Sequence, residues 1–352
     1  MSMTKVSIIG GAGYGAAELL RHLLVRDDVE VLRISSKDYI GQRADVVHRH
    51  LAGLTDLVLE DIPPKEAARD CDIVFLAMPH KVTAQVAMEL FDEDVRLIDL
   101  SGDFRLRSLD DYSRDYHPDH PCPDRLGTFA YGLPELHREA IAGAQHVASP
   151  GCFATCITLG LLPLAKAGHL KNTTVRTVAM TGSSGSGVRP QAGTHHPVRH
   201  RNLKPYKVLH HQHRAEILQT LGDAGGDNVA LDFIPVSAPL SRGILAISQL
   251  DLPAGMELDE VQKLYEDTYE DFRLVRMMPH GAMPEVAAVA GTAKVEVGVE
   301  VRIDEDTGVK TLACMSVIDN LIKGGAGQAI QSFNLMTGKP EFFGLDVPGL
   351  WP

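Results

Sequence analysis

The sequence lacks several features that define large classes of protein. It has no apolar run long enough to span a bilayer and no secretory leader, so we expect neither a membrane protein nor a secreted one. Its five cysteines are irregularly spaced and include no C-x-x-C pair, which argues against a disulfide framework and a thiolate zinc site. It has no excess of basic residues, and the net charge of −12 argues against nucleic acid as a partner. We expect a cytoplasmic protein with reduced thiols and no bound metal.

The first residues predict a phosphate-binding turn. Residues 5–10 form a short apolar strand, and a glycine-rich turn then leads into an amphipathic helix. Small residues let the backbone approach a pyrophosphate, which binds at the helix N-terminus. The residues expected to bind the cofactor here are Gly10, Gly13, Tyr14, Gly15 and Ala16.

The end of the next strand, 29–34, bears on the choice of cofactor. In NAD-binding proteins a carboxylate at this point usually binds the ribose 2′-hydroxyl. Here Ser36 and Lys37 offer a hydroxyl and a cation, which would suit the 2′-phosphate of NADP. The alternative is that Lys37 is a solvated loop residue, and the neighbouring Asp38 is a reservation.

Two further strand ends carry polar residues. The apolar run 73–78 is typical of a central parallel strand and ends at Pro79 and His80. The strand 96–100 leads to Ser101 and Arg105. Ligands bind at the carboxyl ends of such strands, so Pro79 and Ser101 are expected near the cofactor and Arg105 near the substrate. The residues from about 107 to 135 are expected to form a long loop.

Cys152 is the candidate nucleophile. It follows a Pro-Gly turn and precedes an apolar helical run, so its thiol lies at the positive end of a helix dipole, which favours the thiolate. A thiolate beside a nicotinamide suggests thioester chemistry with hydride exchange. The alternative is a buried structural cysteine.

The second half of the chain predicts a sheet of a different kind. Strand-like runs with alternating or β-branched residues occur at 174–181, 231–236, 243–250, 293–303 and 310–317, with a helix at 258–269. Few helices interrupt them, which is typical of a mixed, largely antiparallel sheet with one solvated face. The fold class is therefore α/β, a Rossmann-type NADP-binding domain plus an α+β substrate and dimerisation domain. We expect domains at 1–150 and 151–320, and a C-terminal helix and tail, 321–352, that returns to the first domain.

Anion-binding residues are expected in the second domain. The glycine- and serine-rich residues 182–187 could form a phosphate nest or a flexible linker. Residues 189–214 then hold six Lys or Arg and six His with no Asp or Glu, which creates a positive field for an anionic substrate. We assign Gly182, Ser183 and Asn320 to the cofactor, and we assign to the substrate Ser184, Gly185, Arg189, His195, His196 and Arg242.

The basic segment ends in a candidate acid/base group. If a helix begins at His213, then His213 and Glu216 share one face, and the carboxylate can orient the imidazole for proton transfer. His211 is the other candidate for this role. A cysteine, a histidine and an orienting glutamate form a coherent set for nucleophilic catalysis.

Taken together, these motifs resemble the N-acetyl-γ-glutamyl-phosphate reductases of the wider aspartate-semialdehyde dehydrogenase group. The resemblance spans nearly the whole chain and includes 10–19, 77–80, 99–105, 131–135, 150–152, 182–187, 211–213, 242–243 and 319–324. It implies an NADP-dependent acyl-phosphate reductase of arginine biosynthesis, with Cys152 as nucleophile and His213 as acid/base. It also implies a homodimer or homotetramer.

Some residues are closer to a sister group that reduces aminoadipyl phosphate bound to a small acidic carrier protein in lysine biosynthesis. These are 194–197 and the C-terminal residues 344–352. The basic segment could receive such a carrier or only a small anion. Two positions depart from the usual pattern: Lys81 stands where glycine is common, and Ala293 where Asn is frequent. A non-catalytic NADP-binding sensor with a structural Cys152 is the alternative from another class.

Overall fold

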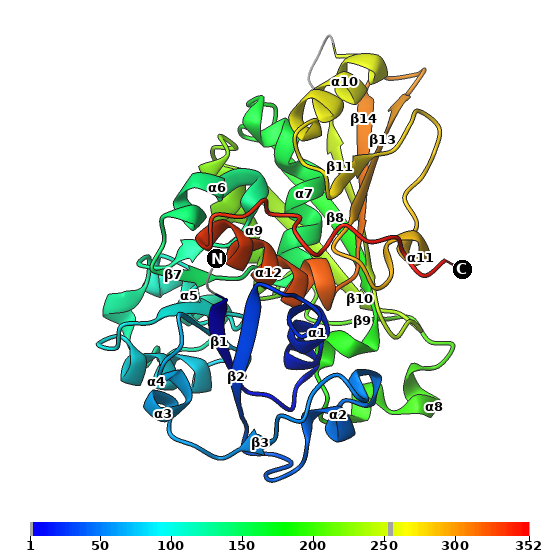
Figure 1. The fold of residues 1–352 in the computed structure, drawn as a ribbon. Helices are drawn as coiled ribbons and strands as arrows, with labels where there is room; N and C mark the ends of the chain where they lie inside the picture. The colour runs from blue at the N-terminus through cyan, green and yellow to red at the C-terminus, as the bar shows by residue number, and fades with distance from the viewer. Residues whose placement is uncertain (1–2, 253–255, 352) are drawn as a thin grey trace. The chain divides into compact units, whose positions relative to one another are not determined.

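The computed structural model describes residues 3–252 and 256–351, and the chain divides into two compact units. The first unit contains residues 3–150 and 325–345, and the second contains 151–324 and 346–351 (Figure 1). We expected the whole of 321–352 to return to the first domain, but the last residues belong to the second unit. Asp346 holds them there through ion pairs with Arg273 and Lys294.

The first unit is built on a parallel seven-stranded sheet in the order β3-β2-β1-β4-β5-β7-β6. Its middle strands are short and buried because helices connect them over the faces of the sheet. The strands are β1 Thr4–Ile9, β2 Val29–Ser35, β3 Leu59–Glu60, β4 Ile73–Leu76, β5 Arg96–Asp99, β6 Ala130–Tyr131 and β7 His146–Ala148.

Helices from both ends of the chain complete this unit. They are α1 Tyr14–Leu23, α2 Ala44–Val47, α3 Pro64–Ala68, α4 Val82–Leu90, α5 Leu109–Asp115, α6 Pro134–Ala142 and α12 Gly327–Met336. The C-terminal helix α12 is part of the core, since the Phe333 ring lies 5.8 Å from that of Phe75. The expected long loop 107–135 was wrong in part, because α5 and β6 form within it. Ser108 begins α5 by accepting a hydrogen bond from the Asp111 N–H.

The second unit contains a mixed seven-stranded sheet in the order β12-β13-β14-β11-β8-β10-β9. Two neighbouring pairs, β8 with β10 and β12 with β13, are parallel, and the other pairs are antiparallel, as the sequence predicts. The strands are β8 Thr174–Thr181, β9 Lys204–Pro205, β10 Ala230–Ser237, β11 Ile244–Asp251, β12 Val275–Met277, β13 Val295–Ile303 and β14 Lys310–Ile318.

One face of this sheet is covered by helices. The central helix α7 is apolar along almost its whole length and buried from Phe153 to Ala165, and the Tyr265 hydroxyl of α10 donates to the Gly160 carbonyl within it, at 2.7 Å. The helices are α7 Cys152–Lys166, α8 His196–Arg199, α9 His213–Asp223, α10 Leu258–Tyr269 and α11 Val286–Val289, and a π-helical turn spans Ile322–Ala326. On the other face, the alternate residues of β8, β10 and β11 remain partly or fully exposed.

Candidate active site

Cys152 is the first residue of α7. Gly151 ends the preceding extended segment at φ −70° and ψ 148°, and the helix then runs for 15 residues, so the Cys152 side chain lies at the positive end of a long dipole. None of the five cysteines forms a disulfide, and Cys152 is partly exposed. Burial raises the pKa of the other four thiols, to about 11 for Cys122 and about 12 for Cys156 and Cys314.

Gly151 brings α7 and α9 into close approach. A Cβ atom built on Gly151 would lie 2.6 Å from Cε1 of His213, so only glycine fits between Cys152 and this imidazole. The same glycine donates its N–H to Oε2 of Glu216 at 2.9 Å. Gly324 packs on the other side, where a Cβ would lie 2.7 Å from Cβ of Cys152. The residue before Cys152 therefore packs directly against His213.

Glu216 contacts both Gly151 and His213. Its carboxylate is fully buried, with one oxygen on the Gly151 N–H and the other 3.8 Å from Nε2 of His213. Both α9 residues lie one turn apart on the same face, as the sequence predicts. This carboxylate can stabilise positive charge on His213 and also fixes the N-terminus of α7.

His211 is held as a neutral imidazole. Burial, and then the neighbouring His213, lower its pKa to about 2. Its Nδ1 accepts the backbone N–H of His213 at 3.2 Å, which leaves Nε2 to carry the proton. His211 can therefore donate a hydrogen bond but is poorly suited to accept a proton near neutral pH.

Aromatic residues fix the two histidines. The Phe153 ring lies edge-on to His211 and His213, at 5.3 and 6.1 Å between ring centroids, and the Tyr206 ring lies 5.8 Å from His211. Tyr206 lies within the basic segment and carries no distinct signal in the sequence. The structure half-buries it beside the histidines, and this burial raises the pKa of its phenol.

The glycine-rich segment 182–187 forms a tight turn, not a linker. The backbone N–H groups of Gly182, Ser183 and Ser184 donate to carbonyls of 240–243, so these three are not available to a phosphate nest. Asn320 braces the turn: its amide donates to Ser184 Oγ at 3.1 Å, and its carbonyl accepts the Gly243 N–H at 2.6 Å. The Ser183 and Ser184 side chains remain partly exposed, as does the backbone of Gly185.

The arginines expected at the substrate have different surroundings. Arg242 forms an ion pair with buried Asp319, which orients its guanidinium. Arg105, in the first unit, is nearly buried and donates to the carbonyls of Ser149 and Leu100 at 2.7 and 2.9 Å. The other expected substrate residues of the basic segment are exposed: Arg189, His195 and His196.

The glycine turn of the first unit has the geometry for a dinucleotide. Gly10 has φ +100°, and a Cβ there would lie 2.5 Å from the Ala77 carbonyl oxygen, so the turn requires glycine. Gly13 precedes α1, whose first turn contains Tyr14, Gly15 and Ala16. The first N–H groups of a helix have no partners within it, and no atom of the described residues lies closer than 3.6 Å to a Cβ built on Gly13 or Gly15, so the residues present fit a pyrophosphate.

The residues at the end of β2 have partners within the first unit. Ser36 is buried and its hydroxyl donates to the Asp38 carbonyl at 2.9 Å. Lys37 is 84% exposed and forms an ion pair with Asp61, a carboxylate that the sequence analysis did not consider. A 2′-phosphate would have to compete with this carboxylate.

The ends of β4 and β5 form one polar network. Nδ1 of His80 accepts the Gly102 N–H at 2.7 Å, next to exposed Pro79. Asp103 accepts the N–H of Lys81, whose φ of +67° explains why glycine would suit that position. The Ser101 hydroxyl donates to Asp99 at 3.0 Å.

Two absences hold for the described part of the chain. Between residues 3 and 252 and between 256 and 351, no group of three or more His, Cys, Asp or Glu side chains is arranged to bind a metal ion. Across the same residues, no helix combines the length and apolarity needed to cross a membrane.

Comparisons with known proteins match both units of the chain. The family model for the semialdehyde dehydrogenase NAD-binding domain matches residues 5–144, and the model for the semialdehyde dehydrogenase dimerisation domain matches 152–320. N-acetyl-gamma-glutamyl-phosphate reductases of Desulforamulus reducens and Desulfotalea psychrophila are 37% and 38% identical, and each alignment covers 99% of this chain and 100% of the relative.

Solved structures share the fold. Aspartate semialdehyde dehydrogenase II from Vibrio cholerae, complexed with ASA, superposes with a TM-score of 0.73 at 17% identity, over 96% of this chain and 99% of that one. The enzyme with NADP from Candida albicans gives 0.67 at 13% identity, with the same coverage. The chain therefore belongs to the semialdehyde dehydrogenase family and, within it, to the N-acetyl-γ-glutamyl-phosphate reductases.

Proposed function

We propose that this protein catalyses the NADPH-dependent reduction of N-acetyl-γ-glutamyl phosphate to N-acetylglutamate 5-semialdehyde and phosphate, in arginine biosynthesis. The observation that carries the proposal is the packing of Gly151 against His213, with Glu216 bound to both, directly beside Cys152. The full-length relatives with this name support the substrate.

In the first step Cys152 attacks the acyl carbon. His213 takes the thiol proton, helped by the carboxylate of Glu216, and the dipole of α7 stabilises the thiolate. The new C–S bond forms as the bond from the acyl carbon to the phosphate oxygen breaks, so phosphate leaves and a thioester remains. The thioester divides a difficult reduction into two easier steps.

In the second step the thioester becomes the aldehyde. NADPH, when bound, supplies the hydride. The resulting thiohemiacetal collapses with cleavage of the C–S bond, and the proton that His213 took from the thiol returns to the departing sulfur. His211, as a neutral donor, is placed to hydrogen-bond the carbonyl oxygen.

The preference for NADP over NAD rests on Ser36 and Lys37. A 2′-phosphate offers more charge than Asp61 and would draw the exposed Lys37 side chain away from it. Lys37→Glu should raise the KM for NADPH far more than the KM for NADH. Equal effects on both cofactors would remove Lys37 from the proposal.

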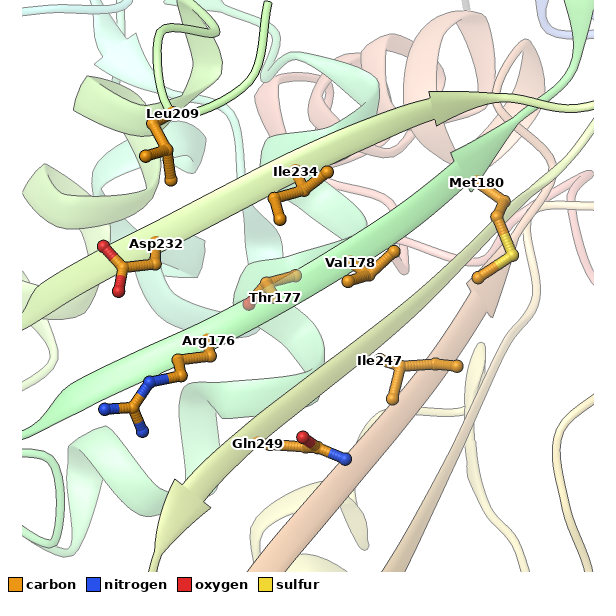
Figure 2. Close-up of a pocket in the computed structure, with 9 residues that line it drawn as sticks. All are labelled: Arg176, Thr177, Val178, Met180, Leu209, Asp232, Ile234, Ile247 and Gln249. Carbon is orange, nitrogen blue, oxygen red and sulfur yellow. The ribbon is translucent and has the colours of Figure 1, made fainter. Parts of the chain in front are cut away.

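Oligomerisation is proposed through the uncovered face of the second unit's sheet. A pocket of about 430 Å³ lies on this face. Figure 2 shows that apolar side chains of three strands lie side by side there: Val178, Met180, Ile234 and Ile247. Arg176 and Asp232 balance each other in charge at one end. All these strands fall within the residues that match the dimerisation domain, so a second copy of the chain is the proposed occupant.

Sedimentation velocity tests this face. Val178→Asp places a carboxylate on a residue that is 38% exposed at the middle of β8, and in a two-fold interface the change occurs twice. We expect it to give monomers. Val25→Asp, on the first unit and 64% exposed, is the matched control and should leave the oligomer intact. A Val178→Asp protein with unchanged sedimentation would exclude this face.

The reverse reaction tests the function. Purified protein is mixed with NADP, phosphate and N-acetylglutamate semialdehyde, and NADPH absorbance is followed. A phosphate-dependent rise that Cys152→Ser abolishes supports the proposal. Turnover that survives Cys152→Ser would refute the thioester mechanism.

The same assay separates the alternatives. The exposed basic segment 189–214 favours a second candidate, the reduction of aminoadipyl or glutamyl phosphate linked to an acidic carrier protein in lysine or arginine biosynthesis. Activity only with a carrier-linked semialdehyde would select it. NADP binding without turnover on either substrate would indicate a sensor. The mechanism needs a reduced Cys152, so we propose the cytoplasm as its compartment.

A further inference from the structure

Arg199 has a buried nitrogen without a partner. It is the last residue of α8, within the basic segment, and its Nη2 donates to the carbonyl of Thr181 at 2.7 Å. Its Nε is buried and makes no hydrogen bond to any described residue. No described carboxylate lies within ion-pair distance of it, and burial lowers the pKa of the guanidinium. A polar nitrogen buried without a partner is costly unless a ligand accepts its hydrogen bond, and a guanidinium favours an anionic acceptor.

The neighbours of Arg199 place it close to Cys152, His211 and His213 of the second unit. Thr181 ends β8 and leads directly into the turn 182–187. Tyr206, seven residues after Arg199, donates its N–H to Pro235 on the adjacent strand and packs edge-on to His211. The charges of Arg199 and of the Cys152 thiolate both act on the pKa of the Tyr206 phenol, so both lie close to that ring.

Arg199 differs from Arg242 in its partners. The Arg242 guanidinium is already paired with the buried carboxylate of Asp319. The hydrogen bond from Arg199 to a neutral carbonyl fixes the guanidinium plane but leaves its charge uncompensated. An Arg held in one orientation loses less side-chain entropy when it binds an anion.

We propose that Arg199 binds the α-carboxylate of the substrate's amino-acid part and so determines specificity for it; this inference rests on the proposed function. The substrate carries two anionic groups. The phosphate is two bonds from the acyl carbon that Cys152 attacks, whereas the α-carboxylate is four bonds away. Arg199 is hydrogen-bonded to Thr181 and lies close to Tyr206, and the longer reach of the α-carboxylate suits this position. Its Nε–H donates to a carboxylate oxygen.

Steady-state kinetics of the reverse reaction test this assignment, because semialdehyde and phosphate are separate substrates there. Arg199→Ala should raise the KM for N-acetylglutamate semialdehyde about 10- to 100-fold, the loss expected for one charge-assisted hydrogen bond. The KM for phosphate and kcat should change less than about threefold. A rise in the KM for phosphate instead would assign Arg199 to the leaving group and overturn the proposal.

The α-carboxamide of the semialdehyde provides the complementary test. In the wild-type protein, the KM for this analogue should exceed the KM for the semialdehyde by the same factor by which Arg199→Ala raises the KM for the semialdehyde. The Arg199→Ala protein should have equal KM values for the carboxylate and the carboxamide. If the variant retains the full preference for the carboxylate, Arg199 does not bind it. Lys204→Ala, which removes one exposed charge from the same segment, measures the effect of the general field alone and should show a small, salt-sensitive loss.

A second measurement does not depend on turnover. N-acetylglutamate should protect Cys152 from alkylation by iodoacetamide in the wild-type protein, its α-carboxamide should protect far less, and Arg199→Ala should abolish the difference. Arg199→Lys, which keeps the charge but not the fixed plane, should restore part of it. Equal protection by the two ligands in the wild-type protein would overturn the proposal even if the proposed reaction failed. If neither N-acetylglutamate semialdehyde nor its α-carboxamide is turned over in the reverse reaction, but the difference in protection remains, the proposed function is refuted and the role of Arg199 in binding the carboxylate stands.

Discussion

Gly151→Ala tests whether the close approach of α7 and α9 is essential. The backbone of Gly151 has φ −70° and ψ 148°, which alanine adopts freely, and the alanine N–H can still donate to Glu216. The new Cβ would overlap Nε2 of His213 and lie 2.6 Å from its Cε1, against an ordinary closest contact of 3.4 Å, so the imidazole must move by at least about 0.8 Å. A displacement near 1 Å at reacting groups costs about 100-fold in rate, and overpacking costs about 1–3 kcal/mol of stability.

The assay combines turnover with alkylation of Cys152. The other four thiols have pKa values raised by burial, so iodoacetamide consumption near neutral pH reports mainly Cys152. We expect kcat/KM to fall about 100-fold and alkylation to slow. Gly222→Ala is the matched control, because it lies on the same helix as His213 and nothing lies within 4 Å of a Cβ built there. It should raise the free energy of unfolding by about 0.5–1 kcal/mol. If Gly151→Ala is as active as Gly222→Ala, the reasoning fails.

Substitutions at three further positions have defined outcomes. Gly324→Ala should crowd Cys152 and slow its alkylation without changing NADP binding, and an unchanged alkylation rate would show that the backbone yields. Glu216→Ala should lower the melting temperature more than Glu216→Gln, because only glutamine can still accept the Gly151 N–H; equal losses would discount that hydrogen bond. Burial, and then the charge of Asp103, raise the pKa of Asp99 to about 7, so the native state keeps a proton that the unfolded chain releases near pH 4. Wild-type stability should therefore fall between pH 4 and 7, by up to about 4 kcal/mol, relative to Asp99→Asn, and parallel melting curves across that range would contradict the assignment.

The elements with clear periodicity were predictable from the sequence. The structure has a helix at Leu258–Tyr269 and a strand at Thr174–Thr181, as expected. An amphipathic helix and a half-buried strand can be recognised in the sequence because their apolar residues recur with the period of the element. The short helix α5 was missed. Its seven residues include three Asp and only one buried side chain, Tyr112, so no apolar stripe marks it.

Helix position and spacing in the sequence predict Cys152, His213 and Glu216 as candidate residues, and the shared face of His213 and Glu216 on α9 is confirmed. The contacts that support these residues were not predictable. The need for glycine at 151 depends on a helix 62 residues later in the chain, and no local pattern encodes that contact. The ion pair between Lys37 and Asp61 is equally remote in sequence, since it depends on the pairing of β2 with β3. The amide groups of 182–184 were misjudged for the same reason, because their acceptors lie at 240–243.

The helix α12 has a consequence for the order in which the protein forms during synthesis. The Gln328 amide donates to the carbonyl of Gly132 at 2.6 Å, and Arg96 donates to the carbonyl of Met336 at 2.6 Å, so the nucleotide-binding unit encloses a helix made almost last. All strands of the second unit leave the ribosome before that helix does. The sheet of the first unit is therefore incomplete until α12 is made, because Phe333 does not yet cover Phe75. The sheet of the second unit can fold before that. Chaperones that bind nascent chains would meet this protein through its first 150 residues.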